Sequence, residues 1–462
     1  MKTINPDNFL LKTDSYKVPH FQQYPANTTY VHSFFESRGG RYPAVLFFGL
    51  QSMIKEHLLG QVVTEESIEE AKELFALHFG STALFNEPGW RYILEKHDGR
   101  LPIEIKAVLE GTKVPVSNVL MTVTNTDPNV PWITNYVETL LVQLWYPITV
   151  ATQSYYMKQV ILRYLEETGT PEDVDFKLHD FGYRGSTSVD SAGIGGAAHL
   201  VNFKGTDTLK ALLIARNHYG EEMAGFSIPA AEHSTITSWG KDHEVDAYEN
   251  MLNLYPTGFV AVVSDSYNIY EACEKIWGGI LKNKVLARDG TLVIRPDSGD
   301  PIEVLPRVLE ILGEKFGYTT NGKGYKVLNP KVRLIQGDGI DHESVGVILE
   351  ALKIAGWSAD NLAFGSGGGL LQKLNRDTQK FAFKCSAALV NGLWQDVIKD
   401  PVTDPGKRSK AGVLALVHNG EGYQTIREED LNGQWNELRT VFRNGELLVN
   451  QPFAAIRKQA QG

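Results

Sequence analysis

Cysteine is scarce in this 462-residue chain, which contains only Cys273 and Cys385. Two cysteines are too few for a disulfide framework, and such low use is typical of a reducing compartment. The N-terminal residues also lack the apolar stretch and the small-residue cleavage site of a signal peptide. We therefore expect a cytoplasmic protein.

Long apolar runs and an excess of positive charge are missing too. The longest apolar candidate, "TLLVQLWYPITVATQ" (139–153), is short and interrupted by Gln and Pro, so it predicts a core helix and no membrane span. The net charge is −10, which argues against broad binding to nucleic acid or acidic membranes. A local basic pocket for a phosphorylated small molecule remains compatible with that charge.

Three catalytic motifs are absent from the sequence. There is no H-E-x-x-H spacing, which makes zinc improbable, and no G-x-S-x-G elbow of a serine hydrolase. The dinucleotide pattern G-x-G-x-x-G does not occur in its expected place between a strand and a helix. Zinc hydrolases, serine hydrolases and dinucleotide enzymes are therefore disfavoured.

The middle of the chain repeats one pattern, in which a short β-rich run ends in small or charged residues and an amphipathic helical stretch follows. The runs are 176–185, 198–207, 225–234, 259–267, 291–300, 332–341, 361–369 and 383–392. Strands that alternate with helices predict a parallel sheet, and about eight such units favour an irregular (β/α) barrel over an open sheet. The fold class is therefore α/β.

The remaining segments predict a second, mostly β domain. Residues 103–125 alternate like antiparallel strands, residues 130–167 are typical of two helices, and residues 413–450 contain Asn-Gly hairpin turns. We expect N-terminal helices and a β-rich segment over 1–150, the catalytic barrel over 151–400, and a C-terminal β segment over 401–462. The last would pack with the N-terminal β-rich part.

Charged side chains gather at the predicted strand ends. In (β/α) barrels the active site lies at the C-terminal ends of the strands. These ends carry His179, Asp180, Arg184, Asp207, Glu232, His233, Asp265, Arg295, Asp297 and Asp338. Stability alone would more often place plain turn formers there. We therefore expect a catalytic site on this rim.

Several of these features have simpler interpretations. The glycine loops "IQGDGID" and "FGSGGGLLQ" suit phosphate binding, but glycine clusters also make tight turns. Asp300 precedes Pro301 and is better explained as a helix N-cap, whereas Arg295 and Asp297 slightly favour a site. The residues alone favour a solvated basic loop for "KDPVTDPGKRSK", and leave His233 open between core packing, a metal ligand, a proton shuttle and a nucleophile.

Eleven strings together resemble the nicotinamide phosphoribosyltransferase family. They include "TDSYKVPHFQQYP", "KLHDFGYRG", "HLVNFKGTDT", "PAAEHSTI", "VVSDSYNIY", "IRPDSGDP" and "FGSGGGLLQKLNRD", and they span nearly the whole chain. The resemblance implies an irregular α/β barrel with a β-rich domain, and a homodimer with shared active sites. It also implies transfer of the phosphoribosyl group of 5-phosphoribosyl 1-pyrophosphate (PRPP) to nicotinamide. The products would be nicotinamide mononucleotide and pyrophosphate, and ATP and Mg²⁺ would take part.

The resemblance also assigns roles to single residues. Phe181 and Tyr16 of the partner subunit would sandwich the pyridine ring, while Arg295 and Asp207 would bind the carboxamide. Phosphate, pyrophosphate and ribose would be held by Arg184, Gly337, Asp338, Gly367, Gly368, Arg376, Arg38, Lys384, Lys399 and Lys407. Mg²⁺ would bind mainly through phosphates and water.

By the same resemblance, ATP phosphorylates His233, with Asp265 as its orienting partner, Glu232 as a weaker contributor and Asp297 nearby. A carboxylate at position 207 accepts an amide NH₂ and repels a carboxylate substrate, and nicotinate enzymes of the wider family lack it. Nicotinamide is therefore the expected base, with nicotinate as the alternative. A third hypothesis is a non-catalytic binding protein on the same scaffold.

Overall fold

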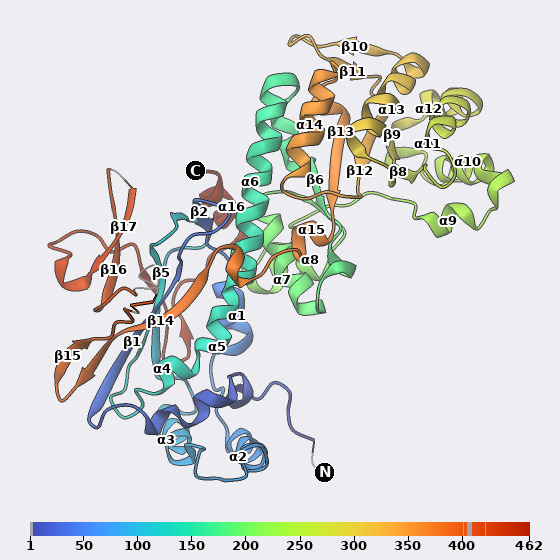
Figure 1. Cartoon of the computed structure of the whole chain (residues 1–462). Coiled ribbons are helices and arrows are strands. Elements are labelled where there is room, and N and C mark those ends of the chain that lie inside the picture. The colour runs from blue at the N-terminus through green and yellow to red at the C-terminus, as the bar shows by residue number, and fades with distance from the viewer. Residues whose placement is uncertain (1–2, 401, 404–408, 421) are drawn as a thin grey trace. The chain divides into compact units, whose positions relative to one another are not determined.

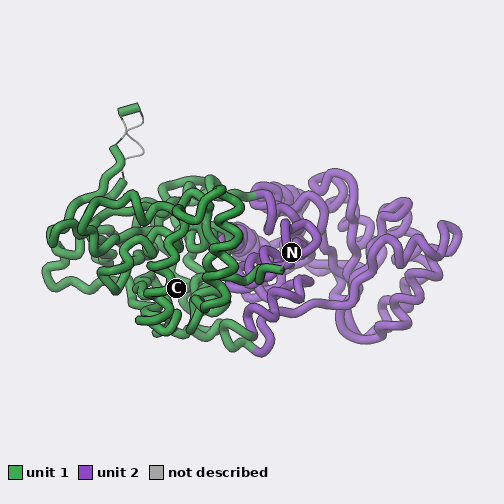
Figure 2. Tube along the Cα trace, turned by 90° about the horizontal axis from the view of Figure 1, so that it is seen from below, with its two compact units in different colours: residues 1–152, 217–221, 374–462 green, residues 153–216, 222–373 purple. Residues whose placement is uncertain are grey.

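The computed structural model describes residues 3–400, 402–403, 409–420 and 422–462. The chain divides into two compact units (Figure 2). Unit 1 comprises 1–152, 217–221 and 374–462, and unit 2 comprises 153–216 and 222–373. Among the described residues no helix is both long and apolar enough to cross a membrane.

Unit 1 is built on a seven-stranded antiparallel sheet with the order β15-β14-β1-β5-β3-β18-β19 (Figure 1). Its strands are β1 (Thr28–Ser37), β3 (Ile103–Ala107), β5 (Val119–Asn125), β14 (Phe381–Val390), β15 (Leu393–Asp396), β18 (Arg439–Arg443) and β19 (Glu446–Leu447). Two small sheets pair β2 (Ala44–Leu46) with β4 (Lys113–Pro115) and β16 (Leu414–Asn419) with β17 (Gly422–Arg427). The antiparallel pairing predicted for 103–125 and the union of N- and C-terminal strands are present.

Asn-Gly turns form two hairpins of unit 1, of which only the one at Asn444-Gly445 was predicted. Asn444 and Gly445 have φ of 50° and 82° and join β18 to β19. Asn391 and Gly392, with φ of 52° and 77°, join β14 to β15 in the same way. Positive φ at both central residues suits a two-residue turn whose twist matches the strands.

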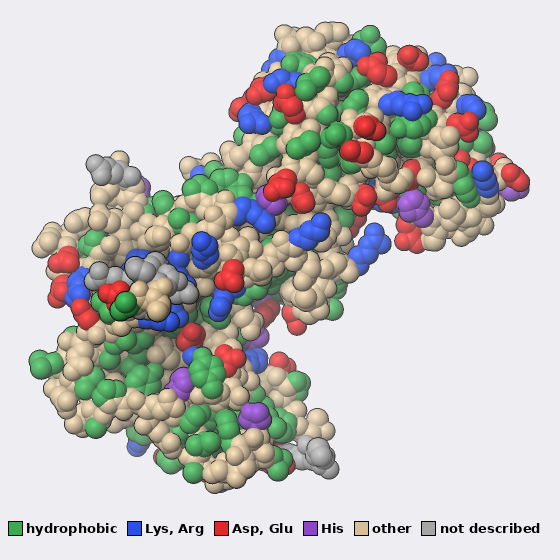
Figure 3. Space-filling model, in the orientation of Figure 1, with side chains coloured by type: hydrophobic (Ala, Val, Ile, Leu, Met, Phe, Trp, Pro, Cys, Tyr) green, Lys and Arg blue, Asp and Glu red, His purple; other side chains and the backbone are tan. Residues whose placement is uncertain are grey.

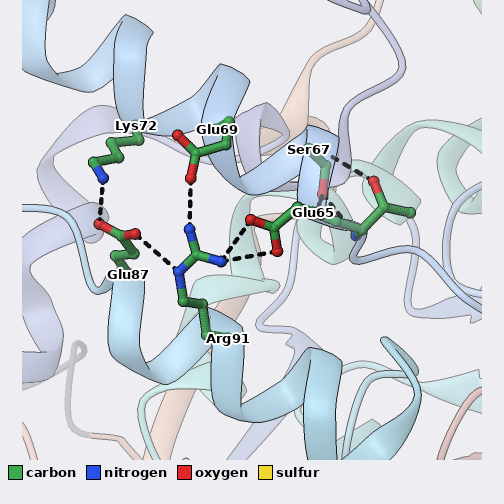
Figure 4. A network of polar contacts seen from close by, with 7 residues as sticks. Glu65, Ser67, Glu69, Lys72, Glu87 and Arg91 are labelled. Atoms are coloured by element: carbon green, nitrogen blue, oxygen red, sulfur yellow. Dashed lines mark hydrogen bonds and ion pairs between the residues drawn. The ribbon is translucent and has the colours of Figure 1, made fainter.

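Helices cover the apolar side chains of unit 1. They are α1 (Leu50–His57), α2 (Glu65–Phe79), α3 (Glu87–His97), α4 (Ile133–Tyr136), α5 (Glu138–Leu141) and α16 (Phe453–Gln461). Arg91 on α3 binds Glu65, Glu69 and Glu87 at 2.7, 2.5 and 2.9 Å, and so links α3 to α2 (Figure 4). Such exposed pairs add little stability, because solvent screens them.

Unit 2 contains a curled parallel sheet with the order β7-β6-β13-β12-β9-β8. Its strands are β6 (Leu178–Asp180), β7 (Gly205–Thr206), β8 (Thr257–Val263), β9 (Asp289–Arg295), β12 (Val332–Gln336) and β13 (Leu362–Ser366). Single parallel bridges, Gly205 to Phe226 and Ala230 to Ala261, make residues 226–230 span the gap between β7 and β8. The irregular barrel expected from the sequence is therefore present.

Helices surround this sheet and bury its outer face. They are α6 (Trp145–Thr168, whose first residues belong to unit 1), α7 (Val189–Leu200), α8 (Leu209–Tyr219), α9 (His233–Thr237), α10 (Glu244–Leu254), α11 (Ile269–Glu271), the π-helix η7 (Ala272–Ile280), α12 (Lys282–Ala287), α13 (Pro301–Phe316), α14 (Ser344–Ile354) and α15 (Gly368–Leu371). A small hairpin pairs β10 (Tyr318–Thr320) with β11 (Lys326–Leu328). Asp300 caps α13 by accepting from the Ile302 amide at 3.1 Å, which confirms its predicted role.

Two predicted barrel strands and one boundary are wrong. Residues 198–200 end α7, and only 205–206 form a strand. The prediction failed because the apolar pattern of "AHLVNF" is compatible with a buried helix as well as with a strand. Residues 383–392 lie in β14, which pairs antiparallel with β1 in unit 1. Residues 374–400 therefore belong to unit 1, although the predicted barrel domain extended to 400.

Acidic and basic side chains both occur on the visible face of each unit (Figure 3). On the face shown in Figure 3, acidic and basic side chains alternate over unit 2, with apolar atoms between them. This face therefore shows no broad surface of a single charge over unit 2.

Candidate active site

His233 stands at the first position of α9, directly after the segment that bridges the edges of the barrel sheet. Its Nε2 lies 3.3 Å from Asp297 Oδ2 and 3.8 Å from Asp265 Oδ1. Its Nδ1 lies 3.4 Å from Ser266 Oγ, and 46% of the side chain is exposed. Two carboxylates at Nε2 favour a proton on that nitrogen and leave the lone pair on Nδ1. His233 is therefore neither a core residue nor isolated.

The acids around His233 differ in detail from the prediction. Asp297, and not Asp265, makes the shorter contact with the imidazole. Asp265 is nearly buried, and its Oδ1 has no hydrogen-bond partner among the described residues. Glu232 accepts a hydrogen bond from Ser234 Oγ, so its carboxylate serves the start of α9. Ser266, which the sequence reasoning did not single out, completes the surroundings of the ring.

Arg295 ends β9 and lies beside the same acids. One guanidinium nitrogen is 3.6 Å from Asp297 Oδ2. Its Nε is buried without a hydrogen-bond partner among the described residues. A buried unpaired donor is costly, so this atom has capacity for a polar ligand group.

Phe181 follows β6 and is fixed by its neighbours. Its amide donates to Ser366 O at 2.9 Å. Its ring lies so close to Gly365 that a Cβ there would stand 1.9 Å from the ring. Glycine is therefore required at 365, a reason that sequence spacing alone did not reveal. The ring also packs against the small apolar layer of Ala261, Val293, Ile335, Ile228 and Ala363 inside the barrel.

A cavity of about 800 Å³ occupies the inside of the barrel. Its walls include His179, Ile228, Val293, Ile335 and Ala363, and Val293 and Ile335 belong to the apolar layer against which Phe181 packs. The wall also contains charged residues at or just before the starts of the strands, among them Lys177, Arg333 and Asp360.

Asp207 follows β7. Its amide donates to Asp180 O at 2.9 Å, and its carboxylate accepts a hydrogen bond from Ser227 Oγ. The side chain is exposed. Ser227 therefore orients this carboxylate, a role that the sequence did not predict.

The predicted phosphate groups of unit 2 lie on two loops and a turn. Arg184 is exposed in the turn η5 (Tyr183–Gly185), and a Cβ on Gly185 would stand 3.4 Å from the Gly368 amide nitrogen. Around Gly368 itself such an added atom would meet only open space. Gly185, the residue after Arg184, is thus a neighbour of the Gly367-Gly368 backbone, and the space beside Gly368 is open. Gly337 packs near Phe181 and Asp297, and Asp338 is exposed beside it.

The predicted basic residues of unit 1 form a separate group. Burial lowers the pKa of Lys384; the neighbouring Glu138 raises it, and the positive charges of Arg38, Lys399 and Arg376 lower it further. Arg38 Nε is buried without a partner among the described residues. A bound polyanion would reduce the electrostatic repulsion between these neighbouring cations. Lys407 lies outside the described residues.

Tyr16 lies in unit 1 on η2 (Ser15–Gln22). Its side chain is 61% exposed, and its ring meets His20 edge-on with centroids 5.1 Å apart. Lys17 Nζ lies over the ring, 5.3 Å from its centroid, and the rest of the side chain is open to solvent.

Metal-binding capacity is limited. The described residues contain no group of three or more His, Cys, Asp or Glu side chains that could hold a metal ion. Asp265 and Asp297 offer hard oxygen donors, and Asp265 Oδ1 is unpartnered. This donor set fits an ion such as Mg²⁺ that takes most ligands from phosphates and water.

Comparison with known proteins places the chain. Residues 176–446 match the model of the nicotinate phosphoribosyltransferase (NAPRTase) family, and residues 8–105 match the nicotinamide phosphoribosyltransferase N-terminal domain. A nicotinamide phosphoribosyltransferase of Xanthomonas campestris is 53% identical over 98% of both chains. One of Acinetobacter baylyi is 34% identical over 99% of this chain and 97% of its own.

Solved structures support the fold. The nicotinate-nucleotide pyrophosphorylase of Pyrococcus furiosus has a TM-score of 0.61 at 14% identity, over 100% of this chain and 97% of that one. The human nicotinic acid phosphoribosyltransferase has a TM-score of 0.58 at 15% identity, over 97% and 92%. The chain is an enzyme of the phosphoribosyltransferase class, and it belongs to the nicotinamide phosphoribosyltransferases within the NAPRTase family.

Proposed function

We propose that this enzyme transfers the phosphoribosyl group of PRPP to nicotinamide, giving nicotinamide mononucleotide and pyrophosphate, in a step coupled to ATP hydrolysis. The carrying observation is the rim of unit 2. There Phe181, Arg295 and the carboxylates lie at strand ends around an apolar interior, with His233 held between Asp297 and Ser266. The names of the relatives support the same reaction.

The pyridine ring would stack on Phe181. Arg295 has an unpaired Nε, which suits the carboxamide oxygen, while Asp207 would accept from the amide nitrogen. Tyr16 of the partner subunit is proposed for the other ring face, within a homodimer. Holding the ring nitrogen in line with the anomeric carbon converts a bimolecular attack into an intramolecular one.

The phosphates of PRPP would be shared between two kinds of group. Arg184 and the backbone of Gly367, Gly368 and Gly337-Asp338 suit the 5′-phosphate. The cations Arg38, Lys384, Arg376 and Lys399 suit the pyrophosphate, whose charge grows as it leaves. Lys407 stays in the proposed set. Mg²⁺, when bound, would neutralise phosphate oxygens, with Asp265 and Asp297 contacting it or its waters.

ATP coupling is proposed to pass through His233. Nδ1 would attack the γ-phosphorus as the bond to ADP breaks, and Asp297, aided by Asp265, would stabilise the imidazole through Nε2. Glu232 would keep the start of α9 in place. The phosphorylated ring would add negative charge and acceptor oxygens near the metal and PRPP.

One assay tests the whole proposal. Purified protein is incubated with PRPP and Mg²⁺, with nicotinamide or nicotinate, and with or without ATP, and the mononucleotides are quantified. Nicotinamide mononucleotide should form, and ATP should increase its yield. Product from nicotinate alone would favour the alternative base, and no product from either would support a non-catalytic binding protein.

A further inference from the structure

Asp180 is a buried acid for which the reaction has no direct use. It ends β6, directly before Phe181, and none of its side chain is exposed. Buried carboxylates are rare unless their oxygens are satisfied by specific partners. Its surroundings therefore need an explanation.

The carboxylate of Asp180 organises the turn that follows it. Oδ1 accepts a hydrogen bond from the Gly182 amide at 2.7 Å, the pattern of an Asx turn. That turn leads into η5, which carries Arg184, and it lets the Phe181 amide reach Ser366 O. A Cβ on Gly182 would stand 2.6 Å from Leu371 Cγ, so the turn has little alternative space.

The other side of Asp180 faces β7 and the residue after it. Its backbone oxygen accepts from the Asp207 amide at 2.9 Å. Oδ2 and Thr208 Oγ1 are both buried, and the Thr208 hydroxyl lies near enough to the carboxylate to stabilise its charged form, although neither atom makes a hydrogen bond of good geometry within the described residues. A Cβ on Gly196 of α7 would stand 2.9 Å from Oδ2, so the helix packs directly on the carboxylate.

The electrostatic balance agrees with this geometry. Burial raises the pKa of Asp180 to about 6, the hydrogen bond from the Gly182 amide and the nearby Thr208 and Thr206 hydroxyls lower it, and the negative charge of Asp207 raises it. The hydrogen bond from the Gly182 amide thus favours the charged carboxylate, against the effect of burial.

We infer that Asp180 is a positioning residue that sets Phe181 and Arg184 in register for ring and phosphate at once, which rests on the roles proposed for those residues. It touches neither substrate. Its side chain acts through the Gly182 amide, and its main chain fixes Asp207 from the same strand end.

Two variants separate this role from simple packing. Asp180→Ala removes the acceptor, whereas Asp180→Asn keeps an oxygen for the Gly182 amide and places an amide group opposite Thr208. Leu178→Ala, in the buried position two residues earlier on β6, is the control for loss of core packing. Asp180→Ser offers a weaker acceptor, should the alanine variant fail to fold.

Kinetics give the first readout. In Asp180→Ala the KM values for nicotinamide and for PRPP should each rise at least about tenfold, while kcat stays within about threefold. Asp180→Asn should return both KM values to within about threefold of wild type. A folded alanine variant with both KM values unchanged, or a KM rise of the same size in Leu178→Ala, would overturn the inference.

Hydrogen–deuterium exchange of the ligand-free protein gives a readout that does not require turnover. Amides of residues 181–186 should exchange at least about tenfold faster in Asp180→Ala than in wild type, but not in Asp180→Asn or Leu178→Ala. Unchanged exchange would sink the inference even if the enzyme is active. If exchange is faster in Asp180→Ala but the wild-type protein makes no mononucleotide, the turn still depends on Asp180, and the proposed function is what has failed.

Discussion

At the scale of single residues, Asp207 controls which base the proposed site accepts. Its carboxylate is exposed and oriented by Ser227, where an amide substrate would donate to it and a carboxylate substrate would be repelled. Asp207→Ser should therefore raise the ratio of kcat/KM for nicotinate over nicotinamide by at least about tenfold. Steady-state assays with both bases measure this ratio, and an unchanged ratio would refute the role.

His233 offers a second test, with a matched control. His233→Ala should abolish ATP hydrolysis coupled to product formation, because no other group replaces the nucleophilic nitrogen. His243→Ala removes an exposed histidine that also contacts an acid, Asp246 at 2.6 Å, and should leave both activities near wild type. ATP turnover that persists in His233→Ala at the wild-type rate would contradict the assignment.

Many of the charged residues at the candidate site could be predicted from the sequence. The residues at strand ends, from His179 to Asp338, were recognisable because parallel strands place their C-terminal ends on one rim. Ser266, Ser227 and Gly365 were not recognisable, since a serine beside an imidazole or a glycine beneath a ring is defined only by contacts in space. That Asp297, at 3.3 Å from His233 Nε2, is nearer than Asp265, at 3.8 Å, likewise cannot be predicted from sequence spacing.

At the scale of elements, the backbone of β13 at Gly365 packs directly against the Phe181 ring. Gly365→Ala would place a methyl group 1.9 Å from the Phe181 ring and must displace it. The KM for nicotinamide should rise at least about tenfold. Gly346→Ala on α14 is the control. Its new Cβ would make an ordinary 3.5 Å contact with Val160 on α6, so the KM for nicotinamide should stay unchanged. Equal KM values in the two variants would exclude the close approach.

A pH-sensitive group, Glu110 in the loop between β3 and β4, contacts the start of α1. Burial raises the pKa of Glu110 to about 7, although the amides of Gln51, Gly49 and Leu50 lower it by donating to the carboxylate. Because the folded state binds this proton more tightly than the unfolded chain does, stability is lost as pH rises from about 4.5 to about 7. The loss amounts to about 3 kcal/mol for a shift of this size.

Glu110→Gln should therefore remove this part of the pH dependence. Urea unfolding of wild type and variant at several pH values measures it, and the variant's free energy of unfolding should be flatter between about pH 4.5 and pH 7. Glu73→Gln, an exposed change on α2, should leave the wild-type slope intact. Parallel curves for wild type and Glu110→Gln would contradict the assignment.

Element boundaries show where pattern reading fails. The run at 383–392 is apolar like a barrel strand, but its partners are β1 and β15, and pairing is decided by the whole sheet. The apolar residues of "AHLVNF" follow no clear period, so their spacing does not distinguish a helix from a strand. By contrast, Asp300-Pro301 and Asn444-Gly445 were read correctly, since a cap and a two-residue turn depend on adjacent residues only.

At the scale of the whole molecule, the predicted homodimer with shared sites has a direct test. Tyr16→Ala and His233→Ala subunits should each form dimers that lack ATP-coupled mononucleotide synthesis, which is the activity that the assay measures. Co-refolding them should restore up to roughly a quarter of wild-type activity, because half of the dimers would contain one intact site of two. Size-exclusion chromatography with light scattering checks the dimer itself. A monomer, or no recovery in the mixed sample, would contradict shared sites.

The composition of unit 1 from three pieces of chain has a consequence in time. β1 is paired on one side with β5, nearby in sequence, and on the other with β14, so that Thr28 faces Val390. During synthesis the sheet of unit 2 is complete once Ser366 has emerged, whereas β1 still has an open edge. Long-range pairing of this kind is slow and leaves strand edges exposed. The newly made chain therefore passes through an interval in which its barrel can fold but its antiparallel sheet is unfinished, and this interval is when it is most prone to aggregate.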